Sequence, residues 1–202
     1  MFDEQLIKKE VQANRAASEE EKTKKIMSEL MERQKNQKTI LTFFEEISKG
    51  TVELDQKQYK TEKRKFFQDR INLIVFPEDI ESYHVQDQMV IINYKELEFS
   101  VNVYDAKTKM NPMQGEDYQL QIMKQVRECE MAYEPVESGE LCSGPYSLTY
   151  ASGIINSKEG YLFTMSFYTP SESGIVGSFT SRLRKRFPYE NLFRAMLEHF
   201  YV

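Results

Sequence analysis

The sequence has few of the residues on which metal centres and nucleophilic catalysis depend. It contains two cysteines, Cys129 and Cys142, and two histidines, His84 and His199, scattered over 202 residues. Transition-metal sites need such side chains in clusters, so no metal site is predicted. No phosphate-binding glycine pattern and no G-x-S-x-G nucleophile motif occurs. We therefore expect no cofactor and no catalytic residue.

Long apolar runs are also missing. No stretch approaches the ~18 apolar residues of a membrane span, and the first ten residues lack the basic and apolar segments of a secretion signal. We expect a cytoplasmic protein that binds no membrane, and in that compartment reduced, partly buried Cys129 and Cys142 rather than a disulfide. The net charge of -5 and a pI near 5.3 disfavour nucleic acid as a partner.

The polar residues offer no second route to catalysis. His84 lies in a segment expected to be a loop, and His199 is expected on the C-terminal amphipathic helix next to Phe200, so both are interpreted as ordinary surface or half-buried histidines. The acidic run 19–21 and the pair Glu116 and Asp117 are expected on helix surfaces or at a helix start, where carboxylates favour the helix dipole.

What the sequence does contain indicates a globular body with a charged extension. Apolar residues make up 40% of the chain and charged residues 29%, and the aromatic residues are concentrated from Phe66 onward. Residues 3–37 are rich in strong helix formers and hold no proline or glycine, so they are predicted to form one long helix.

This helix is predicted to be part of an arm over residues 1–50. Its apolar positions recur at alternating steps of four and three, with polar interruptions, which is typical of a weak coiled coil. A solvated helix held only by its ends fits equally well. Met27, Leu30 and Met31 are its candidate interaction residues. Residues 39–49 are more apolar, and Gly50 suits a helix C-cap, so this part is expected to dock on the body.

The body is predicted to be an α+β domain over residues 70–202, after a polar connector at 51–69. Hairpin-like spacing and period-two alternation favour a mainly antiparallel sheet packed with helices. The expected elements are strands at 71–76, 88–94, 97–104, 146–155, 161–168 and 175–183, a helix at 118–129, and a C-terminal helix whose start is marked by Pro188.

One dense basic cluster stands between the last expected strand and the last helix. It consists of Arg182, Arg184, Lys185 and Arg186. It is a candidate contact for phosphate or for an acidic partner, although a run of this kind is more often a solvated strand end.

The order of these elements resembles the PsbP-like superfamily. The resemblance is carried by the early strand ended by Pro77, the Phe99–Val103 alternation, the helix near 118–129, the strand pair at 146–155 and 161–168, and Gly177–Thr180 before the last helix. It implies an αβα sandwich with a binding role, because bacterial members of the family include chaperones for secreted effectors. The arm before residue 66 departs from the family pattern.

Together these observations predict a non-enzymatic protein–protein interaction module, such as an adaptor or a secretion-associated chaperone, whose partner is another protein. The alternative is a structural, self-associating protein that forms a homo-oligomer through the N-terminal helix. An enzyme with an unrecognised site is the third hypothesis.

Overall fold

The structure is a computed structural model that describes residues 37–143, 146–158 and 160–201. The predicted helix at 3–37 and its residues Met27, Leu30 and Met31 therefore lie outside the described residues, apart from Gln37. From Lys38 onward the chain forms one compact unit. The helix α2 (Ile40–Ser48) belongs to this unit, since Phe43 is fully buried, as the apolar segment at 39–49 predicted.

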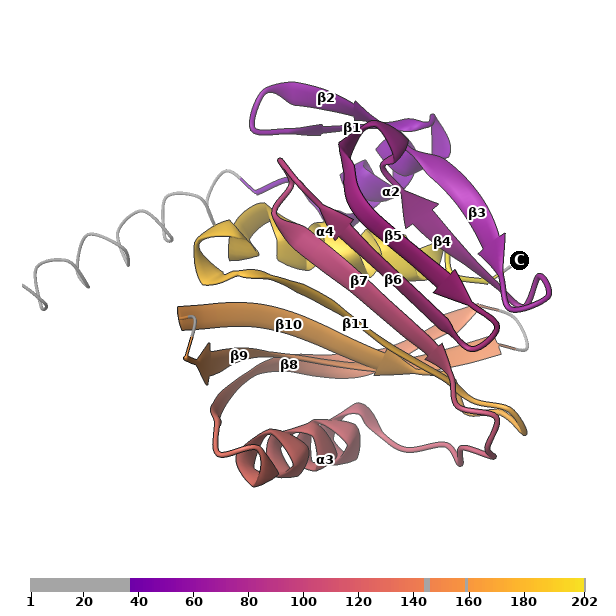
Figure 1. Ribbon diagram of the computed structural model, residues 1–202, viewed down its shortest axis with the longest axis vertical. Helices are drawn as coiled ribbons and strands as arrows, with labels where there is room; N and C mark the ends of the chain where they lie inside the picture. Colours follow the sequence, from indigo (N-terminus) through magenta and orange to yellow (C-terminus); the bar gives the residue numbers. More distant parts are fainter. Residues whose placement is uncertain (1–36, 144–145, 159, 202) are drawn as a thin grey trace, which may run out of the picture. The chain divides into compact units, whose positions relative to one another are not determined.

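A seven-stranded antiparallel sheet forms the centre of this unit, in the order β5-β6-β7-β11-β10-β9-β8 (Figure 1). Short turns join most neighbours, which explains the antiparallel pairing. Its strands are β5 (Ile80–Gln86), β6 (Met89–Tyr94), β7 (Phe99–Asp105), β8 (Ala132–Ser143), β9 (Tyr146–Ser157), β10 (Gly160–Tyr168) and β11 (Ile175–Arg182).

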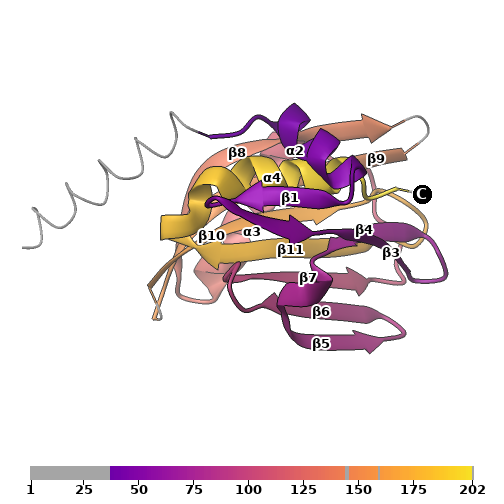
Figure 2. The ribbon, with the colours of Figure 1, turned by 90° about the horizontal axis from the view of Figure 1, so that it is seen from above.

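Helices lie on both faces of the sheet (Figures 1 and 2). The helix α4 (Arg186–Glu198) covers the face that we call the inner face, and α2 packs against α4. The helix α3 (Gly115–Glu128) lies on the opposite, outer face, beside β8 and β9. The described body is therefore an α+β fold with its sheet between helices, as the sequence predicted.

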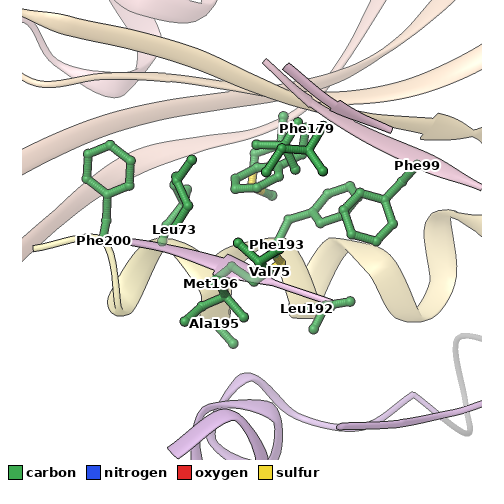
Figure 3. Packing of buried hydrophobic residues seen from close by; sticks show 14 of the residues in the cluster. Leu73, Val75, Phe99, Phe179, Leu192, Phe193, Ala195, Met196 and Phe200 are labelled. Atoms are coloured by element: carbon green, nitrogen blue, oxygen red, sulfur yellow. The ribbon is translucent and has the colours of Figure 1, made fainter. Parts of the chain in front are cut away.

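Aromatic side chains form the core between α4 and the inner face (Figure 3). Phe193 of α4 is fully buried, and its ring stacks on Phe179 of β11 with centroids 4.9 Å apart. Phe99 of β7 lies 5.2 Å from Phe193. Such ring pairs add to the free energy gained by burying apolar area, so they fix the position of α4 on the sheet.

Two hairpins occupy residues 51–75, where the sequence predicted a polar connector followed by one strand. They consist of β1 (Thr51–Leu54) with β2 (Lys57–Lys60), and β3 (Glu62–Phe66) with β4 (Ile71–Val75). The connector prediction was wrong because β1, β2 and β3 bury few of their positions, so polar and charged residues prevail in this stretch. The strand β4 is buried along its whole length, as its apolar run predicted.

Both edge strands of the large sheet were missed. β5 is exposed at most of its positions, so it lacks the alternation by which a half-buried strand is found, and His84 lies in it rather than in a loop. β8 contains Pro135 and Gly139, which are typical of loops. The cysteines are free, as expected, but both are exposed rather than partly buried. Cys129 follows the last residue of α3, and Cys142 lies near the end of β8.

Candidate interaction surface

The basic cluster of the sequence is largely engaged within the fold. Arg184 Nη2 donates to both carboxylate oxygens of Glu98, at 2.6 and 2.9 Å. Lys185 Nζ lies 3.2 Å from Asp55, and Arg186 lies 2.9 Å from Glu190. Arg182 is exposed and forms no ion pair with any described residue. The structure thus pairs three of the four cations with carboxylates, and their role in binding stays a prediction.

A different surface is presented by the outer face of β5, β6, β7 and β11. Its side chains form three rows across the strands, and the middle row runs from His84 through Ile91 and Asn102 to Ser178. The twelve residues of the three rows, which we call the open face, are Gln86, Met89, Tyr104 and Val176; His84, Ile91, Asn102 and Ser178; and Ser82, Asn93, Ser100 and Thr180.

The open face carries no Asp, Glu, Lys or Arg, although 29% of the chain is charged. Three of its side chains are exposed and the other nine are half-buried by their neighbours in the sheet. Depletion of charge at the centre of a surface is the compositional mark of protein–protein interfaces. An ordinary solvated sheet face in so charged a protein would carry several charged residues.

Helix α3 explains why only part of the outer face is open. Tyr118 of α3 packs on Ala151 of β9 and on Tyr168 of β10, with the two tyrosine rings 4.7 Å apart. Burial raises the pKa of Tyr118. Tyr168 lies beside Val176 in the same row as Tyr104. Val176 itself packs against the cluster of Tyr118, Ala151 and Tyr168, so the cover by α3 reaches the border of the open face. No described helix lies over the remainder (Figure 1).

A cleft of about 380 Å³ lies at the end of β5 nearest the β5–β6 turn. It is lined by apolar and charged side chains together: Phe66, Phe67, Gln68, Arg70, Val85, Gln86, Asp87, Val90, Asp105 and Lys107. Its volume lies within the range of ligand pockets. In the β3–β4 turn, Phe67, Gln68 and Asp69 all have a positive φ, of 53°, 59° and 64°. Three successive left-handed residues without glycine are costly, and such outliers are typical of functional sites.

A polar cluster anchors this turn. Arg70 Nη1 donates to Asp105 Oδ2 at 2.8 Å, and Arg70 Nη2 donates to the carbonyl oxygen of Ser173. Ser173 Oγ donates to Asp105 Oδ1 at 3.0 Å. Burial by itself raises the pKa of Asp105, but the hydrogen bonds from Lys107 N, Ser173 and Arg70 outweigh it and lower the pKa. The cluster joins the β3–β4 hairpin to β7 and to the β10–β11 loop.

The two histidines have different surroundings. His84 is exposed on the open face. His199 is buried, and its ring stacks on Phe44 of α2 with centroids 4.2 Å apart. Burial lowers its pKa, even though its Nε2 lies 3.3 Å from the carbonyl oxygen of Phe44. His199 therefore joins α4 to α2, and the interpretation of it as a surface or half-buried residue understated its burial.

Among the described residues, no three His, Cys, Asp or Glu side chains are grouped closely enough to hold a metal ion. None of the helices in the described part of the chain combines the length and the apolar character that a membrane crossing requires.

Comparisons with known proteins bear on the fold. No family model and no curated protein sequence matches this chain. Among solved structures, the chain is similar to cyanobacterial PsbP (CyanoP) from Synechocystis sp. PCC 6803, with a TM-score of 0.54 and 11% sequence identity. The match covers 75% of this chain and 97% of that chain. A sequence identity this low supports a conclusion about the fold alone. The chain has a PsbP-like fold, as the order of strands and helices in the sequence predicted.

Proposed function

We propose that this protein is a non-enzymatic binding module, an adaptor or a secretion-associated chaperone, and that its open face binds another protein. The observation that carries the proposal is the absence of charge from twelve adjoining side chains on a sheet face that no described helix covers as a whole. Removing such a surface from water leaves no unpaired charge behind, which keeps the desolvation cost of association low.

The chemistry of the face suits a protein partner. Tyr104 is 40% exposed and offers a rigid aromatic contact. Asn93 and Asn102 provide amide groups that both donate and accept hydrogen bonds. Asn93 Nδ2 donates to Ser82 Oγ at 2.7 Å, so part of this polar layer is already ordered before binding, which reduces the entropy lost on association.

Site-specific photo-crosslinking in the native cell tests the proposal. A photoreactive residue replaces Asn102 at the centre of the open face, and the matched control replaces Gln125, an exposed amide residue on α3. The Asn102 position should crosslink to a protein of different sequence, and the Gln125 position should not. Equal yields from the two positions would contradict the proposal, and an adduct only with the protein's own copy would favour the self-association hypothesis.

A charge variant gives the energetic test. Asn102→Lys places an ammonium group without a partner at the centre of the interface, which weakens the captured complex by about 3 kcal/mol, or about a hundredfold in Kd. Gln125→Lys adds the same charge outside the face and should leave Kd unchanged. Equal Kd values for the two variants would place the interface elsewhere.

A further inference from the structure

No described strand pairs with the outer edge of β5, and the register of β5 shows which backbone groups point outward. The amide of Asp105 donates to the carbonyl oxygen of Gln88 at 2.9 Å, so even-numbered residues of β6 bond to β7 and odd-numbered residues bond to β5. The β5 partners of those odd-numbered residues are Gln86, His84 and Ser82. The backbone N–H and C=O groups of Tyr83 and Val85 therefore point away from the sheet, and no described residue bonds to them.

The opposite edge of the same sheet provides an internal comparison. β8 contains Pro135, a register irregularity between Pro135 and Glu137, and three glutamates at positions 134, 137 and 140. Proline, bulges and charge are the features by which proteins prevent pairing at a sheet edge. In β5 the irregularity and the single charge are confined to residues 80–82, and 83–86 hold neither charge nor proline. The β8 edge is therefore protected against pairing with another strand, whereas residues 83–86 of the β5 edge are not.

The side chains at this edge are apolar and exposed. Tyr83 is 40% exposed and Val85 is 47% exposed, on the inner side of the strand. The guanidinium group of Arg64 lies 5.9 Å from the centre of the Tyr83 ring. Val85 also lines the cleft. A residue paired with Val85 on an added strand would lie on the same side of the sheet, with its side chain at the mouth of the cleft.

Carboxylates mark both ends of the edge. Glu81 and Asp87 are exposed, and neither forms an ion pair with any described residue. A segment with Lys or Arg at both ends would complement them. A second copy of β5, paired antiparallel about His84, would instead place Asp87 opposite Glu81 of the other copy twice, and like charges directly opposite are destabilising. In this register, which pairs Tyr83 with Val85 twice, the charges favour a foreign, basic-ended segment over self-pairing.

We propose that an extended segment of a partner protein, apolar at alternate positions and basic at its ends, pairs with β5 as an additional strand and places one side chain in the cleft. The inference rests on the proposed function and names its binding mode. Backbone hydrogen bonds supply affinity in this mode, and alternate side chains supply specificity. The left-handed turn at Phe67–Asp69, held by Arg70, forms part of the wall of the cleft.

The probe follows from the register. The acetylated, amidated heptapeptide Lys-Thr-Val-Thr-Val-Thr-Lys sets its two valines opposite Val85 and Tyr83, its first lysine opposite Asp87 and its last lysine near Glu81, which lies in the irregular segment 80–82. Binding to the full chain is followed by NMR, together with amide hydrogen exchange. At saturation, exchange at Tyr83 and Val85 should slow more than tenfold. The same peptide with both valines N-methylated, and the peptide with glutamate in place of lysine, should each bind at least tenfold more weakly.

Variants of the protein complete the test. Val85→Pro removes an outward N–H without touching the ladder to β6 and should raise Kd at least tenfold; Val85→Lys serves if the proline variant does not fold. Leu120→Lys, at an exposed apolar residue of α3, is the matched control and should bind normally.

Three results would overturn the inference. The first is no binding at about 1 mM peptide. The second is equal affinity for the peptide and its N-methylated form. The third is slow amide exchange at Tyr83 and Val85 without peptide, in a protein that forms a dimer. Crosslinking from Asn102 with a failed peptide test would retain the proposed function and reject this binding mode.

Discussion

The Arg70 cluster permits a stability prediction that can be worked in detail. The carboxylate of Asp105 is 10% exposed and the side chain of Arg70 is 35% exposed, with 2.8 Å between Nη1 and Oδ2. This pair lies between an exposed pair, which contributes about 0.2–1 kcal/mol, and a buried one, whose disruption costs about 3–5 kcal/mol. Arg70→Met keeps the apolar stem and removes the charge, so we expect a loss of about 2 kcal/mol at neutral pH.

A double-mutant cycle with Asp105→Asn isolates the pair from other effects of each change. Urea denaturation should give a coupling energy of about 1.5 kcal/mol between the two positions. Because the pKa of Asp105 is lowered in the folded state, its contribution is complete above the unfolded value near 4 and is lost as the pH falls through the lower folded value. The cost of Arg70→Met should therefore shrink in acid. A coupling below about 0.3 kcal/mol at pH 7 would refute this reasoning.

Two further predictions concern the core and the α2–α4 contact. Phe193→Ala should lower the free energy of unfolding, measured by urea denaturation, by about 4 kcal/mol, because it leaves a cavity among stacked rings. Phe193→Leu should lower it by roughly 1–1.5 kcal/mol. Equal losses for the two variants would contradict the packing described for Phe193. Because burial lowers the pKa of His199, the unfolded chain takes up its proton first. Stability should be complete above about pH 6.5 and fall as the pH drops below it. His199→Gln should flatten this dependence between pH 7.5 and 5, and an unchanged slope would show that His199 does not cause it.

The sequence predicted those elements whose burial is visible in their own residues. The run at 71–76 is apolar at every position except Asn72, because β4 is buried along its whole length. The alternation at 99–103 is visible because β7 has one buried side. The helix near 118–129 and the C-terminal helix were recovered from apolar residues at helical spacing. In each case the spacing of the apolar residues follows from which side of the element is buried, so the element can be predicted from the sequence.

The strand β5 at the sheet edge was not predicted, because exposure on both of its sides removes the alternation of buried apolar and exposed polar residues. Tyr83 and Val85 in β5 could have been found only by asking why two apolar residues alternate in an exposed stretch. The basic cluster shows what adjacency in sequence leaves open, since Arg184 and Lys185 are consecutive in sequence but pair with Glu98 and Asp55, which are distant in the chain.

The α+β class, the antiparallel strand pattern, the PsbP-like order of elements and the scarcity of catalytic side chains all depend on composition and local period, so they could be predicted from the residues. Tertiary contacts set which faces and edges no other described element covers. The uncharged residues of the open face come from four strands between Ser82 and Thr180. The cleft joins residues from Phe66 to Lys107. Such surfaces arise from strand register and helix placement, which bring together residues that no local pattern connects.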